Sequence, residues 1–82
     1  MKSAAMVKAG RELAGWSQAE LAERAGLSLP TVQRMESANF GPLRSSGANL
    51  EKLRNAFAQA GVSFTSEGGR ECVCIDRADG SA

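Results

Sequence analysis

The sequence contains no histidine and only two cysteines, and both shortages narrow the chemistry open to it. Without an imidazole, the chain lacks the general base of the usual hydrolytic triads and the commonest metal ligand in proteins. Cys72 and Cys74 would point to the same face of a strand, but two cysteines at this spacing fit neither a zinc site nor a disulfide framework. We therefore expect a protein that is not an enzyme and holds no metal and no cofactor. We expect the cysteines to be small strand residues of a reduced cytoplasmic chain, with redox sensing or metal binding as the alternatives.

Long apolar runs are also missing. After Lys2 the apolar run covers only residues 4 to 7, which is too short for the core of a signal peptide. No stretch approaches the length needed to span a bilayer. We expect a soluble protein that is not exported and has no membrane partner.

Neither sign of charge is in large excess, since the net charge is only +1. Its distribution is less even. Residues 1–60 carry eight basic and five acidic side chains, whereas residues 61–82 carry two basic and four acidic ones. The body is therefore mildly basic and the tail acidic.

Residues 17–36, SQAELAERAGLSLPTVQRME, carry the clearest local pattern in the chain. Ser17 followed three residues later by Glu20 is a capping box, which predicts a helix that begins at Gln18. Ser28 is the expected cap of a second helix. Each cap is flanked by the residue pair of a hydrophobic staple: Trp16 with Leu21, and Leu27 with Val32.

The two helices are expected to be joined by a tight turn. Gly26 can adopt the left-handed conformation in which helices commonly end. Pro30 falls in the first turn of the second helix, where its missing N–H costs little. The stretch therefore predicts a helix, a glycine turn and a second helix.

The rest of the chain supplies flanking elements. Helical spacing predicts one helix over about residues 3–14 and another over about residues 47–60, whose core face is Leu50, Leu53, Phe57 and Ala60. Between them, residues 37–46 are expected to form a loop anchored by Phe40 and Leu43. Alternating apolar residues around a Glu67-Gly68-Gly69 turn predict a β-hairpin over residues 62–76. Residues 77–82 are expected to be a flexible polar tail.

Residues 6–61 resemble the lambda-repressor-like, Xre-type helix-turn-helix family of bacterial and phage regulators. The family pattern R-x-L-x-G-x-S-Q-x-x-L-A-x-x-A-G-x-S is matched by Arg11, Leu13, Gly15, Ser17-Gln18, Leu21-Ala22, Ala25-Gly26 and Ser28, and Glu36 is the Glu that commonly ends the third helix. The resemblance implies a mainly α fold, a four-helix bundle over residues 1–61, followed here by the short C-terminal hairpin. The fifth helix of larger repressors is missing, so their helical dimer interface does not carry over.

The resemblance implies a sequence-specific transcriptional regulator that binds double-stranded DNA. On a helical wheel, Val32 and Met35 point inward. The opposite face carries the residues expected to contact bases: Leu29, Pro30, Gln33, Arg34 and Ser37. Arg34 can pair with guanine O6 and N7, and Gln33 can make the two-bond pairing with adenine.

Phosphate contacts are expected where helices begin, because N-terminal N–H groups lack partners there. The candidates are Gln18 and Ser46, with Ser28, Thr31 and Arg44 as further ones. In the family the residue matching Gln18 binds phosphate and often braces the reading helix. Arg11 and Glu36 resemble the family's structural ion pair.

The hairpin raises the question of self-association, because an isolated two-stranded sheet has open edges. We expect residues 62–76 to pair with a second copy through Val62, Phe64, Val73 and Ile75. Such a homodimer would set two reading helices about 34 Å apart on a pseudo-palindromic operator. The alternative for the hairpin is packing on its own helices. The alternative function is an antitoxin-like or other protein-interaction module, with a protein partner and secondary DNA binding.

Overall fold

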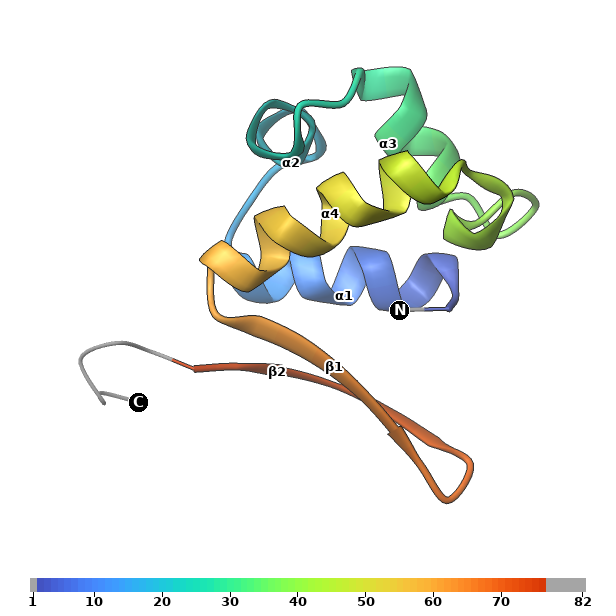
Figure 1. Ribbon diagram of the computed structural model, residues 1–82, viewed down its shortest axis with the longest axis vertical. Coiled ribbons are helices and arrows are strands. Elements are labelled where there is room, and N and C mark those ends of the chain that lie inside the picture. Colours follow the sequence, from blue (N-terminus) through green and yellow to red (C-terminus); the bar gives the residue numbers. More distant parts are fainter. Residues whose placement is uncertain (1, 77–82) are drawn as a thin grey trace.

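The computed structural model describes residues 2–76, which form a helical body with a β-hairpin beneath it (Figure 1). The elements are α1 (Ala4–Ala14), α2 (Gln18–Ala25), α3 (Leu29–Met35), the 3-10 helix η1 (Pro42–Arg44), α4 (Gly47–Gln59), β1 (Val62–Glu67) and β2 (Arg70–Ile75). The predicted mainly α fold, with four α-helices and a C-terminal hairpin, is confirmed. The tail predicted for residues 77–82 lies outside the described residues.

Serine caps set where the helices begin. Each of the four α-helices starts directly after a serine whose side chain accepts a hydrogen bond from a backbone N–H three residues on: Ser3, Ser17, Ser28 and Ser46. At the end of α2, Gly26 is left-handed with φ of 68°, as the predicted turn requires. The boundaries of the helix pair are therefore confirmed.

The capping box at α2 is only half formed. The backbone N–H of Glu20 donates to Ser17 Oγ at 3.0 Å, as predicted. The carboxylate of Glu20, however, accepts from Arg24 Nη2 at 3.0 Å and does not serve as the return arm of the box. Arg24 lies one turn further along the helix, at the spacing of a favourable ion pair, and binds this carboxylate instead.

The helices enclose one apolar core. Its largest fully buried side chains are Phe57, Leu21, Met35, Leu53, Val7 and Val32. Burial of a side chain of this kind contributes about 1.5 to 3 kcal/mol to folding. In Figure 1, α2 and α3 lie above α1 and α4. Because α3 rests on this core through Val32 and Met35, its opposite face remains outside.

The connection between α3 and α4 is more ordered than the predicted loop, since it contains η1. Phe40 is half-buried, as expected of an anchor, but Leu43 is 63% exposed. Pro42 is the residue of η1 that is fully buried. The expectation that Leu43 anchors this segment is therefore wrong, because η1 turns Pro42 inward and leaves its neighbour in solvent.

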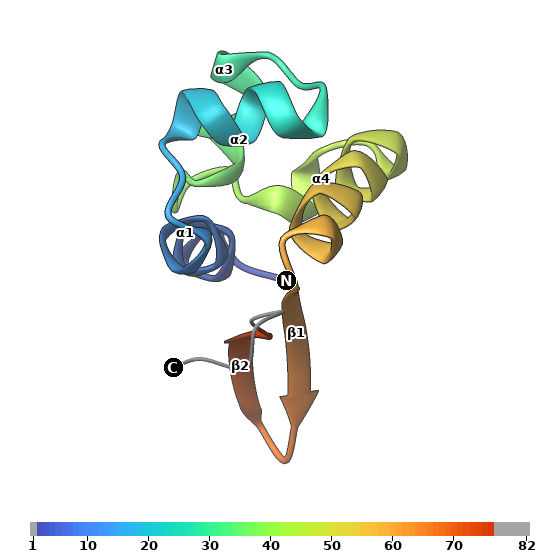
Figure 2. The same cartoon turned by 90° about the vertical axis from the view of Figure 1, so that its left-hand side faces the viewer.

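The hairpin packs on the helices of its own chain (Figure 2). Gly68 and Gly69 form its turn with φ of 58° and 78°, the positive values that a type I′ turn requires. The register pairs Val62 with Ile75 and Phe64 with Val73, so these four side chains share the face toward the helices. Phe64 meets Phe57 edge to face, with the ring centroids 5.3 Å apart.

Candidate nucleic-acid interface

A buried carboxylate fixes the end of α3. Glu36, the residue that follows this helix, accepts from Arg11 Nε at 2.7 Å and from Arg11 Nη2 at 3.0 Å. It also accepts from Gln18 Nε2 at 3.2 Å. The side chains of Arg11 and Glu36 are only 12% and 3% exposed. One carboxylate thus ties α1, the start of α2 and the end of α3 together.

The structure contains the ion pair that the resemblance implies, and its geometry is that of a strong one. Two parallel N–H groups of a planar guanidinium meet both oxygens of a carboxylate, an arrangement that adds orientation as well as energy. The hydrogen bond to Glu36 raises the pKa of Arg11, against the opposing effect of burial. Arg11 Nη1 also donates to the carbonyl of Trp16 at 2.8 Å, which holds the segment between α1 and α2.

The outward face of α3 is formed by the predicted base-contact residues. Val32 and Met35 are fully buried, which confirms the inward direction of the helical wheel. The residues predicted on the opposite face lie as follows: Leu29, Pro30, Gln33 and Arg34 are exposed, and Ser37 is half-buried just beyond the helix. The anchored helix therefore presents one continuous polar and apolar surface to solvent.

Arg34 does not extend freely from this face. Its Nη2 donates to Thr31 Oγ1 at 3.3 Å, and its guanidinium lies 5.9 Å from the centre of the Phe40 ring. Arg44 lies 5.1 Å from the centre of the same ring and donates to the carbonyl of Asn39 at 3.3 Å. Attraction between a cation and an aromatic face contributes about 0.5 to 1 kcal/mol at exposed sites. The guanidinium groups of Arg34 and Arg44 therefore lie close to the same ring, that of Phe40, and form one basic patch.

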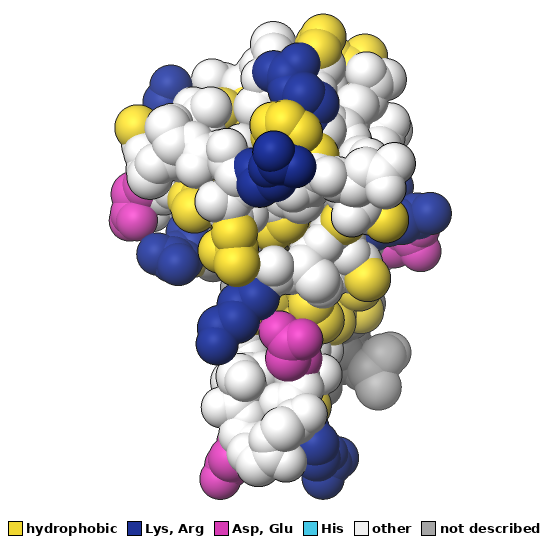
Figure 3. Space-filling model, turned by 90° about the vertical axis from the view of Figure 1, so that its right-hand side faces the viewer, with side chains coloured by type: hydrophobic (Ala, Val, Ile, Leu, Met, Phe, Trp, Pro, Cys, Tyr) yellow, Lys and Arg dark blue, Asp and Glu magenta, His cyan; other side chains and the backbone are white. Residues whose placement is uncertain are grey.

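The segment that contains α3, η1 and the start of α4 is basic on its surface, although the whole chain is almost neutral. Between residues 28 and 50 the sequence holds two arginines, Arg34 and Arg44, and one acidic residue, Glu36. The acidic residue is buried against Arg11, whereas both arginines are exposed. Figure 3 shows basic side chains on either side of an apolar one in the upper centre, while acidic side chains lie at the margins and over the hairpin.

The predicted phosphate contacts lie at helix starts and in the loop before α4. Ser28 and Thr31 are joined by a 2.8 Å hydrogen bond between their hydroxyl groups at the start of α3. Gln18 begins α2 and is half-buried, with one amide hydrogen bond made to Glu36. Ser46 is exposed and caps α4, two residues after Arg44. Hydroxyl, amide and guanidinium donors therefore lie at both ends of α3 and at the start of α4.

The four residues predicted for dimerisation are placed differently from that expectation. Val62 is buried, and the remaining three, Phe64, Val73 and Ile75, are half-buried against the helical core of their own chain. The alternative of packing on the own helices is thus realised for these side chains. The backbone edges of the hairpin are not used by this packing, because within residues 2–76 the sheet has two strands only.

Two further contacts were missed by reasoning from the sequence. Arg24 lies 4.8 Å from the centre of the Trp16 ring, and Trp16 stacks on Phe57 at 6.0 Å. The spacing of Glu20 and Arg24 could have predicted their ion pair. No local signal joins Trp16 to Arg24 across the whole of α2, or Phe40 to both arginines.

The described residues contain neither a cluster suited to a metal ion nor a membrane-spanning helix. Within residues 2–76, no three His, Cys, Asp or Glu side chains lie close enough to hold a metal ion. No helix in the described part of the chain is long and apolar enough to cross a membrane.

Comparison with known proteins agrees with this geometry. Residues 7–58, more than half of the chain, match the helix-turn-helix family. No curated protein gives a match. Members of this family bind DNA and are not normally enzymes. The match covers most of α1, all of α2 and α3, and nearly all of α4, so it includes both the helix pair and the residues that anchor it. The chain belongs to the lambda-repressor-like, Xre-type helix-turn-helix family of DNA-binding proteins.

Proposed function

We propose that this protein is a cytoplasmic transcriptional regulator that binds a pseudo-palindromic operator as a homodimer, with α3 in the major groove. The observation that carries the proposal is the fixed orientation of α3. Val32 and Met35 hold one side of the helix in the core, while Arg11 and Gln18 hold its end through Glu36. A helix fixed in this way presents its outward side chains with little further loss of conformational entropy on binding.

Two side chains on that face can read bases through paired hydrogen bonds. The guanidinium of Arg34 matches O6 and N7 of guanine, and the carboxamide of Gln33 matches N6 and N7 of adenine. Leu29 and Pro30 offer apolar contact, for which the thymine methyl group is the natural partner in this groove. Ser37 adds a hydroxyl at the C-terminal end of the helix.

Phosphate groups would be bound by the donors on either side of α3. Backbone N–H groups at the starts of α2 and α4 could bind a phosphate, and Arg44 adds a full positive charge near the second of these helix starts. Ser28 and Thr31 offer hydroxyl groups at the start of α3. Such contacts would set the position of the protein on the duplex, and the α3 side chains would supply the sequence preference.

A dimer follows from the small number of base-reading groups. Two residues with bidentate geometry in one copy distinguish few base pairs, whereas two copies related by a two-fold axis read the same short sequence twice. The half-sites would then lie about one helical turn, roughly 34 Å, apart.

A second candidate function is a protein-interaction module in which DNA binding is secondary. The observation in its favour is the exposure of two large apolar side chains, since Leu29 in α3 is 38% exposed and Leu43 in η1 is 63% exposed. Apolar side chains on an exposed surface can serve a protein partner as well as thymine methyl groups.

A salt titration separates the two functions. Binding to random and to selected duplexes would be measured by fluorescence anisotropy at several salt concentrations. If DNA is the partner, the logarithm of the affinity falls linearly with the logarithm of the salt concentration, by about 0.9 for each phosphate neutralised. Absence of binding to any selected duplex at low salt would favour the protein-interaction function. A palindromic consensus among the selected sequences would support the dimer.

A further inference from the structure

The outer edge of β2 is an unused pairing surface. The hairpin has two strands, so each strand keeps one edge that no other described strand covers. Asp76 N donates to Gly61 O at 2.9 Å, which makes this pair a hydrogen-bonded one. Hydrogen-bonded and non-bonded pairs alternate along an antiparallel ladder. In β2 the N–H and C=O groups of residues 71, 73 and 75 therefore point away from β1, toward the open edge.

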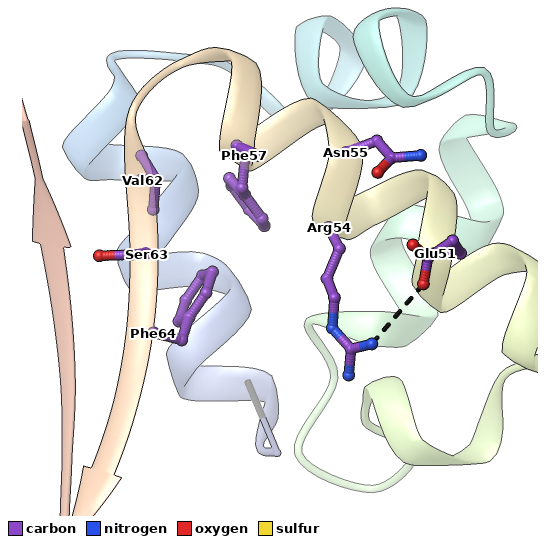
Figure 4. Close-up of a pocket in the computed structure, with 8 residues that line it drawn as sticks. Glu51, Arg54, Asn55, Phe57, Val62, Ser63 and Phe64 are labelled. Atoms are coloured by element: carbon purple, nitrogen blue, oxygen red, sulfur yellow. Dashed lines mark ion pairs between the residues drawn. The ribbon is translucent and has the colours of Figure 1, made fainter.

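The corresponding edge of β1 lies beside α4. A shallow hollow beside β1 is lined by Glu51, Arg54 and Phe57 of α4 together with Val62 and Phe64 (Figure 4). Figure 4 shows β2 on the far side of β1 from these α4 side chains. A strand added at β1 would have to fit beside these α4 side chains, so β2 is the better edge for a second chain.

We propose that two copies pair through β2 in an antiparallel register centred on Val73, which sets Cys72 of each copy opposite Cys74 of the other and makes these thiols the site of two interchain disulfides. This proposal specifies the interface of the homodimer in the proposed function, and it rests on that function only for self-association. It does not depend on DNA binding by α3.

Hydrogen bonding favours this register over its neighbours. A two-fold axis at Val73 sets residue 71 opposite residue 75 of the second copy, and residue 73 opposite its own equivalent. All three outward-pointing residues of each strand are then used. Moving the axis by one residue, to Cys72 or Cys74, leaves one outward residue of each strand without a partner among residues 70–75.

Charge and apolar surface agree with the same register. Arg70 falls opposite Asp76 of the second copy at both ends of the ladder, and an opposite-charge pair across strands stabilises a sheet by about 0.2 to 1 kcal/mol. On the face toward the helices, the half-buried Val73 meets its equivalent in the second copy. Both contacts join residues that a monomer leaves partly in solvent.

The cysteines lie on the opposite face of the sheet. Cys74 pairs with Ser63 and Cys72 pairs with Thr65, so both thiols point away from the helices. Cys72 is half-buried and Cys74 exposed, and both are free thiols. In the proposed dimer, Cys72 and Cys74 of the second copy form a non-hydrogen-bonded pair, whose Cα atoms lie about 4.5 Å apart. That separation falls within the range that a disulfide can bridge, about 4.4 to 6.8 Å.

Because cytoplasmic thiols are normally kept reduced, the bond would form when the glutathione pool is oxidised, by exchange with oxidised glutathione. The thiolate of Cys72 attacks one sulfur of glutathione disulfide, which gives a mixed disulfide and releases one glutathione thiolate. The thiolate of Cys74 of the second copy then attacks the Cys72 sulfur and releases the other. Two protein thiols are oxidised and one glutathione disulfide is reduced to two thiols. Two such bonds would hold the dimer at any dilution.

Single-cysteine variants of the full chain test the register. Cys72→Ser and Cys74→Ser proteins, one of them with an affinity tag, would be equilibrated with oxidised glutathione separately and as a mixture, then separated on a non-reducing gel. The double variant is the control, and sedimentation of the reduced wild type gives the oligomeric state. In the proposed register identical cysteines lie on a diagonal of about 7 to 8 Å, too far for a disulfide. The mixture should therefore give at least tenfold more covalent dimer than either variant alone.

Each other outcome contradicts one part of the proposal: its register, its interface or the dimer itself. Efficient cross-linking of Cys72→Ser with itself would place the axis at Cys74, and efficient self-linking of Cys74→Ser would place it at Cys72. A dimer in sedimentation without any cross-link would move the interface to another surface. A monomer at all concentrations would overturn the dimer and its register, while DNA binding by α3 would still be measured by the salt titration.

Discussion

At the scale of single residues, the most consequential side chain is Glu36. Its carboxylate accepts two hydrogen bonds from Arg11 and one from Gln18, and it is almost completely buried. Because these bonds come from α1 and α2 and end at the residue that follows α3, they hold the C-terminal end of α3 against the other two helices. The orientation of the proposed base-contact face and the stability of the fold thus depend on the same carboxylate.

Replacement of Glu36 by alanine should lower the free energy of unfolding by about 3 to 5 kcal/mol, because it leaves the Arg11 guanidinium buried without its partner. Urea denaturation followed by circular dichroism measures this. The matched control is Glu51→Ala, since Glu51 pairs with Arg54 at 3.6 Å and both side chains are 64% exposed. That change should cost less than about 1 kcal/mol. Equal losses in the two variants would show that the buried pair has no special role.

At the scale of elements, the packing of the hairpin on α1 completes the core. Gly10 lies in the middle of α1 and is buried. A Cβ atom at this position would lie 2.7 Å from Phe64 Cζ and 3.3 Å from Phe57 Cε1. Since Phe64 also packs edge to face on Phe57, the ring has little room to move away. A glycine is therefore needed here for close approach of the hairpin to the helix.

Gly10→Ala should destabilise the protein by about 1 kcal/mol, because the overpacking cost of about 1 to 3 kcal/mol exceeds the gain in helix propensity of roughly 1 kcal/mol. Gly47→Ala is the control. A Cβ atom at Gly47, the first residue of α4, meets nothing within 4 Å, so this change should be neutral or slightly stabilising. Thermal unfolding of both variants gives the comparison. If Gly10→Ala were as stable as Gly47→Ala, the close packing of Phe64 on α1 would be refuted.

Most of the elements could be predicted because their signals are local. Serine caps, the left-handed Gly26 and the Gly68-Gly69 turn fix boundaries through contacts only a few residues apart in the chain. The inward direction of α3 followed from the apolar character of Val32 and Met35 together with helical geometry. Together these local features were enough to predict where α3 begins and which of its side chains face outward.

The failures of prediction concern contacts between distant segments. Leu43 was expected to anchor the loop before α4, yet η1 buries Pro42 in its place. The contact of Phe40 with Arg34 and Arg44 depends on how the loop folds back toward α3. Whether the apolar face of the hairpin meets its own helices or another chain depends on space beside Gly10 that no local pattern reveals.

At the scale of the whole molecule, the proposed dimer separates two functions of the hairpin. Its apolar face completes the core of one chain, and the edge of β2 is left for a second copy. The α3 face would then be doubled by two-fold symmetry, while the core remains intact in each copy.

Glu71→Pro should weaken this dimer and leave the monomer folded. The N–H of Glu71 points to the open edge, so proline removes no bond to β1 and is tolerated on an edge strand. The dimer loses two hydrogen bonds at about 1 kcal/mol each, which raises the dissociation constant about 30-fold. Analytical ultracentrifugation measures this against Glu71→Ala, which keeps the N–H and should dimerise almost as wild type. An unchanged dissociation constant for the proline variant would exclude the β2 edge as the interface.

The central claim, that α3 binds DNA bases through its outward face, is tested most directly by removing Arg34. The measurement is the affinity of Arg34→Ala for the duplex preferred by the wild type and for its single-base variants. Arg54→Ala is the control, since it removes an equally charged, exposed side chain on the side of α4 that faces β1.

We predict that Arg34→Ala loses about 1 to 3 kcal/mol of binding free energy and its preference at one base pair, while Arg54→Ala retains both. Unchanged affinity and unchanged base preference in Arg34→Ala, or an equal loss in Arg54→Ala, would contradict the assignment of the α3 face to base recognition.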